Sequence, residues 1–95
     1  MADEIPRGSS LLTASSRPNP VTDRAIFSLT IPPATHGKLS LRNLLGKVVA
    51  IPFDGEGTGE LMTISWSVEG LVPGPYWYEL ESDGNRYTGR LDVVR

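Results

Sequence analysis

Apolar and polar residues alternate with a period of two along most of the chain from Leu11 onward. Residues 25–31 place Ala, Phe, Leu and Ile at every second position. This alternation is typical of a β-strand with one buried face, because apolar residues of an α-helix would recur every 3.6 residues. Pro32-Pro33 ends the segment, since proline lacks the N–H that a sheet ladder requires.

The same pattern predicts further strands, separated by turn residues. Gly46 accepts the positive φ of a tight hairpin, and the Asp83-Gly84 pair signals a second hairpin. Residues 54–59 hold three glycines and no apolar side chain, so we expect a loop there. The other strands are expected at residues 38–43, 47–53, 62–68, 76–80 and 86–94, with a seventh at 11–15.

Short strands at intervals of about 8–12 residues, with turn signals between them, predict an all-β fold. We expect an immunoglobulin-like antiparallel β-sandwich of about seven strands. The leucines of residues 39–49 also fit a short helix, but Gly46 and the β-branched Val48 and Val49 weaken a helix. Ninety-five residues suffice for one domain. We expect residues 1–10 to be an added start and linker, and residues 11–95 to be the domain.

Composition and charge exclude several classes of protein. Nine basic and eleven acidic residues give a net charge of −2 with no basic cluster, so we expect no nucleic-acid partner. Without cysteine there is no disulfide framework and no thiolate metal site. The longest apolar run, Val48 to Ile51, falls far short of the ~20 residues that a membrane-spanning helix needs.

Few residues suggest chemistry. His36 is the only histidine and lies in an expected turn, and no carboxylates are paired on a predicted strand face, so we expect no enzyme activity. Asp54, Glu56 and Glu60 surround glycines, and loops rich in oxygen ligands can hold calcium. Their spacing does not match an EF-hand. We expect no metal site and no cofactor, and calcium binding by this loop stays an open alternative.

The aromatic residues offer a possible binding surface. By alternation, Trp77 lies on the opposite face of its strand from Tyr76 and Tyr78. Core packing explains Tyr76 and Trp66, which leaves Trp77 as the exposed candidate. An aromatic face of this kind suits a carbohydrate partner.

Four motifs in order give the chain a family resemblance. It resembles the type A C-terminal sorting domain carried by cargo proteins of the bacterial type IX secretion system, over residues 11–95. The motifs are Arg17-Pro18-Asn19-Pro20, the segment 39–49 with its Gly46-Lys47 turn, Leu71-x-x-Gly74-x-Tyr76, and the final Leu91-Asp92-Val93-Val94-Arg95.

The resemblance implies a non-catalytic export signal. The cargo would precede the domain, cross the periplasm, and reach the outer membrane, the cell surface or the medium. The partners would be the outer-membrane translocon and a sortase-like peptidase that cuts upstream of the first strand, near Gly8, Ser9 and Ser10. The residues expected to be recognised by the translocon are Gly46, Lys47, Leu71, Gly74, Tyr76, Leu91, Val93, Val94 and Arg95.

For the mechanism, we expect the exposed edge of residues 91–95 to pair with a strand of the translocon. The same edge would permit a strand-swapped homodimer. A different class of function is an adhesive or carbohydrate-binding β-sandwich attached to a secreted enzyme, with Trp77 exposed. A third is a scaffold module of the flagellar hook-cap type, which shares the turn and the Gly-x-Tyr pattern.

Overall fold

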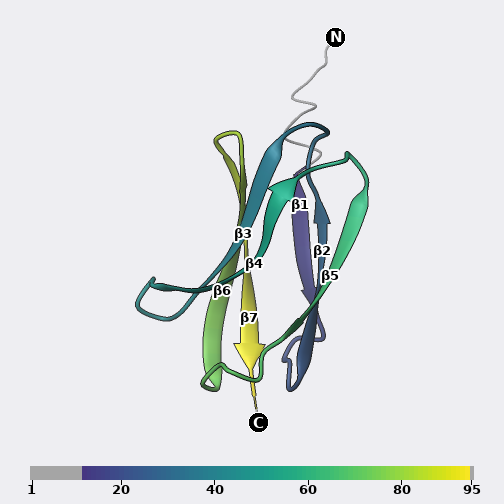
Figure 1. Ribbon diagram of the computed structural model, residues 1–95. Coiled ribbons are helices and arrows are strands. Elements are labelled where there is room, and N and C mark those ends of the chain that lie inside the picture. The colour runs from purple at the N-terminus through teal and green to yellow at the C-terminus, as the bar shows by residue number, and fades with distance from the viewer. Residues whose placement is uncertain (1–11, 95) are drawn as a thin grey trace.

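The computed structural model describes residues 12–94, which form two antiparallel β-sheets (Figure 1). One sheet has the strand order β1-β2-β5 and the other β4-β3-β6-β7. This arrangement confirms the predicted seven-stranded sandwich. Within residues 12–94 no helix is long and apolar enough to cross a membrane. The strands are β1 (Thr13–Arg17), β2 (Arg24–Thr30), β3 (His36–Arg42), β4 (Val48–Glu56), β5 (Leu61–Ser67), β6 (Gly74–Ser82) and β7 (Asn85–Val93).

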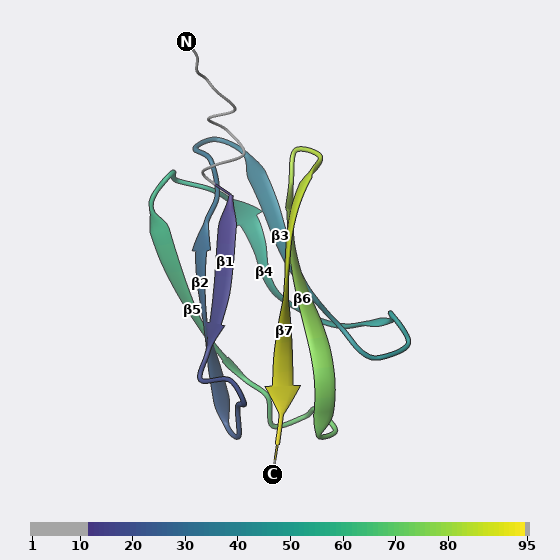
Figure 2. The ribbon, with the colours of Figure 1, turned by 180° about the vertical axis from the view of Figure 1, so that it is seen from behind.

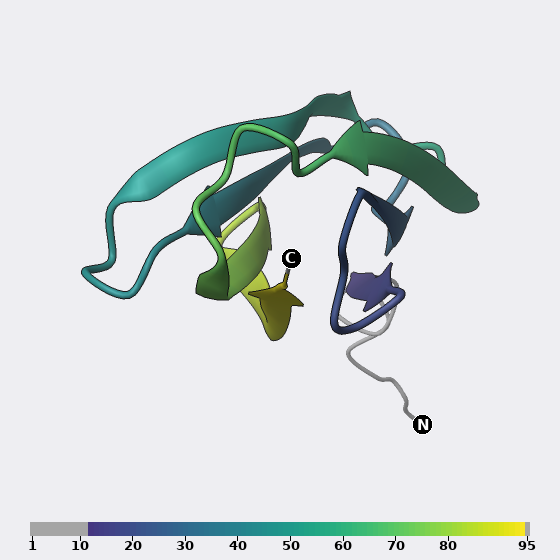
Figure 3. The same ribbon diagram turned by 90° about the horizontal axis from the view of Figure 1, so that it is seen from below.

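The two sheets face each other, as the view along the strands shows (Figure 3). Strand β4 pairs with β3 and lies in the same sheet. In a constant-type immunoglobulin domain, the fourth strand lies in the sheet that does not contain the third strand. Strands β1 and β7 run in the same direction, so the start of β1 and the end of β7 lie at opposite ends of the sandwich (Figures 1 and 2).

The core is built from the inward faces that the alternation predicts. In β2, Ala25, Phe27 and Leu29 are fully buried, while in β6 the buried residues include Tyr78. The rings of Phe27 and Tyr78 meet edge to face across the two sheets, with centroids 5.7 Å apart. Tyr78 also lies across Gly89 of β7, where an added Cβ would come within 2.2 Å of the tyrosine hydroxyl oxygen. Gly89 therefore makes room for a large aromatic side chain in the core.

The glycine-rich segment differs from its prediction. Residues 54–56 belong to β4 and pair with β3, with His36 opposite Glu56, so the expected loop is wrong there. Gly57 is buried, and a Cβ on it would lie 2.5 Å from Ile31. Glycine serves close packing at this position, which composition alone does not distinguish from a flexible loop.

Strand β4 is an irregular edge strand. Its register against β3 shifts between Leu39 and Leu41 and again before Arg42, and Pro52 lies within it. Bulges and proline both interrupt the row of backbone groups that a further strand would need. The outer edge of β4 is thus poorly suited to strand addition.

Candidate functional site

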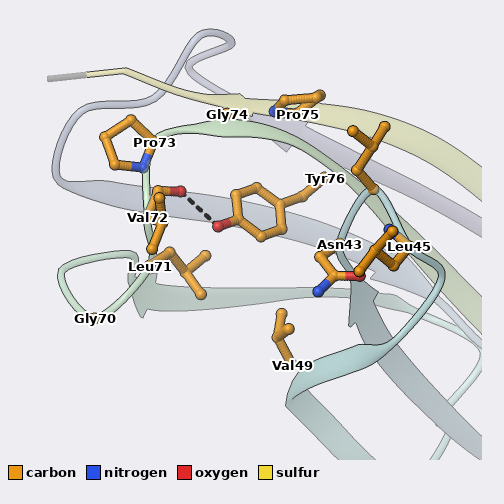
Figure 4. A pocket seen from close by; sticks show the side chains of 11 residues that line it. Asn43, Leu45, Val49, Gly70, Leu71, Val72, Pro73, Gly74, Pro75 and Tyr76 are labelled. Carbon is orange, nitrogen blue, oxygen red and sulfur yellow. Dashed lines mark hydrogen bonds between the residues drawn. The ribbon is translucent and has the colours of Figure 1, made fainter.

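An apolar groove of ≈ 490 Å³ lies between the β3–β4 hairpin and the β5–β6 connection (Figure 4). The hairpin projects from the half of the sandwich where β7 ends, and the connection lies at that same end (Figure 1). Among the described residues, those that line the groove carry no charge. They are Asn43, Leu44, Leu45, Val49, Gly70, Leu71, Val72, Pro73, Gly74, Pro75 and Tyr76.

Asn43 shapes the wall formed by the hairpin. Its Oδ1 accepts hydrogen bonds from the backbone N–H groups of Leu45 and Lys47, both at 3.0 Å, and its backbone oxygen accepts one from Gly46 at 2.9 Å. Gly46 has φ of +82°, which confirms the predicted glycine turn. These hydrogen bonds fix the backbone of the turn, and Leu45 projects from it with 90% of its surface exposed to solvent.

Tyr76 shapes the opposite wall. Its ring is buried, and its hydroxyl donates a 2.5 Å hydrogen bond to the backbone oxygen of Val72. This contact resembles the tyrosine corner of immunoglobulin-like folds, in which a tyrosine ties a connection to the strand that follows it. Gly74 turns the chain with φ of +149°, and Val72 is 74% exposed beside the groove. The Leu-x-x-Gly-x-Tyr motif thus forms one continuous wall.

Pro75 lies at the start of β6, as its missing N–H requires. It pairs with Asp92 of β7, whereas the pairing of β6 with β3 begins only at Trp77. The proline therefore interrupts no central ladder.

The structure separates the predicted recognition residues into two groups. Gly46 and Lys47 lie in the hairpin turn beside the groove, and Leu71, Gly74 and Tyr76 line it. The second group is at the end of the chain.

In the second group, Leu91 and Val93 are fully buried in the core, and Val94 is exposed. A partner cannot contact Leu91 and Val93 while the domain stays folded. Arg95, together with Gly8, Ser9 and Ser10 of the expected cleavage region, lies outside the described residues.

The expectation of an open strand edge at residues 91–95 is wrong over Asp92 and Val94. The backbone oxygen of Asp92 and the backbone N–H of Val94 are already bonded to Val21, at 2.8 and 2.9 Å. The N–H of Asp92 is bonded to the side chain of Asn19. Asn19, Val21 and Asn43 are the residues that sequence reasoning missed, although the Pro-Asn-Pro motif marked the position of Asn19.

Other candidate groups are engaged in contacts on the surface. The exposed side chains of His36 and Asp54 form a pair between β3 and β4, and residues 12–94 contain no cluster of three potential metal ligands. Trp77 lies on the outer face of β6, with the Arg90 guanidinium 5.9 Å from its ring centroid. Tyr78, by contrast, lies in the core, where burial, with a smaller contribution from Tyr87, raises the pKa of its phenol.

The comparison with protein families gives a match that includes both walls of the groove. The model described as a secretion system C-terminal sorting domain matches residues 17–94, which is well over half of the chain. A comparison with curated proteins found no match. The chain therefore belongs to the family of C-terminal sorting domains of type IX secretion, whose members are non-catalytic signals for export toward the outer membrane, the cell surface or the medium.

Proposed function

We propose that the secretion machinery recognises this domain through the apolar groove and the β3–β4 hairpin. The observation that carries the proposal is the convergence of the Gly46-Lys47 turn with the Leu71-x-x-Gly74-x-Tyr76 motif. The two motifs are separated in the chain, yet they meet at one groove. Binding energy in protein interfaces concentrates in such apolar pockets, where a few anchoring side chains exclude water.

The exposed leucines of the hairpin support this location. Leu44 and Leu45 project into solvent, so folding of the domain does not bury them. Exposed apolar side chains beside an apolar groove are typical of a surface that a partner covers. The partner best suited to it is an apolar segment of the translocon, because the groove offers no charge to pair with.

The buried residues of the final strand take part in recognition indirectly. Leu91 and Val93 hold β7 against the core, and β7 in turn pairs with β6, which begins at the groove. Loss of residues 91–95 would therefore remove the strand that holds β6 in place and would destabilise the groove wall that contains Tyr76. Val94 and Arg95 remain candidates for direct contact with the machinery.

The test is export of a reporter fused ahead of residues 11–95 in a bacterium with an active type IX system. Leu45→Asp places a charge at the proposed contact, so we expect surface reporter to fall by about tenfold or more. Leu61→Asp is the matched control, because Leu61 is 67% exposed and does not line the groove. Equal export by both variants, with unchanged thermal stability, would refute recognition at the groove.

We also propose that the cargo crosses the periplasm and is released by a sortase-like peptidase at or near Gly8, Ser9 and Ser10. The support is membership of the family, since these residues lie outside the described part of the chain. Mass spectrometry of the cargo recovered from the cell surface would identify its new C-terminal residue. A cargo that keeps the whole domain at the surface would contradict the proposed cleavage.

A further inference from the structure

Residues 19–21, here called the edge strap, cover the C-terminal part of the outer edge of β7, from Arg90 onward. The Asn19 side chain donates a hydrogen bond from Nδ2 to the backbone oxygen of Arg90 at 2.9 Å and accepts one from the backbone N–H of Asp92 at 3.1 Å. Val21 donates to the backbone oxygen of Asp92 at 2.8 Å and accepts from the N–H of Val94 at 2.9 Å. The strap therefore satisfies a continuous row of outward-facing groups on β7.

The carboxamide of Asn19 takes the place of a peptide group. It offers one donor and one acceptor to the same two backbone groups that a neighbouring strand would use. Val21 then continues the pairing as a parallel bridge opposite Val93. Together, one side chain and one backbone residue imitate a short edge strand.

The two parts of the strap are anchored differently. Val21 is fully buried and belongs to the core, whereas Asn19 is exposed. Removing the Asn19 side chain therefore opens the edge at Arg90 and Asp92 without leaving a cavity in the core.

Of the two edges of its sheet, β7 is the one that needs such protection. Its register against β6 is unbroken from Asn85 to Val93, and it contains no proline. The other edge of the same sheet, β4, is interrupted by bulges and by Pro52. A long, regular edge strand readily pairs with an identical strand of another molecule.

We propose that the edge strap prevents a second copy of this chain from adding a strand to the C-terminal part of β7, from Arg90 onward. The strap acts through Asn19, whose side chain occupies the backbone groups of Arg90 and Asp92. Self-association through β7 does not depend on which surface the secretion machinery binds. It also accounts for an ordered Pro-Asn-Pro segment that the groove does not use.

The experiment compares the full chain with Asn19→Ala and with Asn85→Ala, a control on an exposed asparagine of β7 outside the strap. Amide hydrogen exchange, followed by NMR, should show the N–H of Asp92 exchanging about tenfold faster or more in Asn19→Ala, because exchange reports local opening. Sedimentation velocity over a concentration series should show reversible dimers in Asn19→Ala at concentrations where the unsubstituted chain and Asn85→Ala are monomers.

Asn19→Asp provides a second, nearly isosteric variant. It keeps an acceptor for the N–H of Asp92 but loses the donor to the oxygen of Arg90. Its tendency to dimerise should therefore lie between that of the unsubstituted chain and that of Asn19→Ala. Unchanged exchange at Asp92 in Asn19→Ala would overturn the proposal. So would an Asn19→Ala chain that stays monomeric although Asp92 has become accessible, or an unsubstituted chain that already pairs through β7.

Discussion

The hydrogen bond between Tyr76 and Val72 contributes to the free energy of unfolding, and a single substitution can measure that contribution. Tyr76→Phe removes the hydroxyl and keeps the buried ring, so the core loses no apolar contact. Val72 is exposed, and its carbonyl can bond to water once the phenol is gone. We therefore expect only the net value of one hydrogen bond to be lost, about 1 kcal/mol.

A loss of about 1 kcal/mol lowers the melting temperature of a domain of this size by about 4–8 °C. Thermal unfolding followed by circular dichroism measures it, and urea unfolding should give the same loss with an unchanged m-value. Tyr87→Phe is the control, since Tyr87 is exposed on β7 and its hydroxyl has no hydrogen bond with any of residues 12–94. Equal melting temperatures for Tyr76→Phe and Tyr87→Phe would refute the argument that the phenol ties down the β5–β6 connection.

Further results are expected for three glycine substitutions and for the dependence of stability on pH. Gly57→Ala should destabilise the domain by about 1–3 kcal/mol in urea unfolding, because the new methyl group would meet Ile31 at 2.5 Å. Gly89→Ala should cost a similar amount, because the Tyr78 ring must move. By contrast, Gly70→Ala has no neighbour within 4 Å and should change stability by no more than about 0.5 kcal/mol, and a similar loss in all three would contradict the packing argument. Stability should also fall above pH 10: the raised pKa of Tyr78 means that the folded state favours the neutral phenol, so its contribution is complete below the unfolded value of 10.0 and is lost as pH rises through the folded value. Tyr78→Phe should flatten this decline, and an unchanged pH profile would show that Tyr78 does not cause it.

Local patterns were sufficient for most of the fold. Alternation located β2 because one face of that strand is buried and the other is not, and the turns at Gly46 and Asp83-Gly84 depend on backbone conformations that few residues adopt. Gly57 could not be placed in this way. Its role depends on the approach of Ile31, and no local pattern in the sequence reveals that approach.

The site was predictable in its parts but not in its arrangement. Motif spacing marked Gly46, Leu71 and Tyr76, while their meeting at one groove required the three-dimensional fold. The contacts of Asn19 with β7 join positions 71 and 73 residues apart and involve a side chain acting as a backbone group. The alternation of apolar and polar residues does not reveal such a contact, so the sequence alone predicts an open edge at residues 91–95.

The start of β1 and the end of β7 lie at opposite ends of the sandwich, which separates the entry of the chain from the groove. Strand β1 begins at the end far from the groove, and a nine-residue strand such as β7 spans roughly 30 Å. The first strand is thus entered from the end of the sandwich opposite the groove. The part of the domain nearest to the entry of the chain is then the end of the two sheets that carries no groove residue.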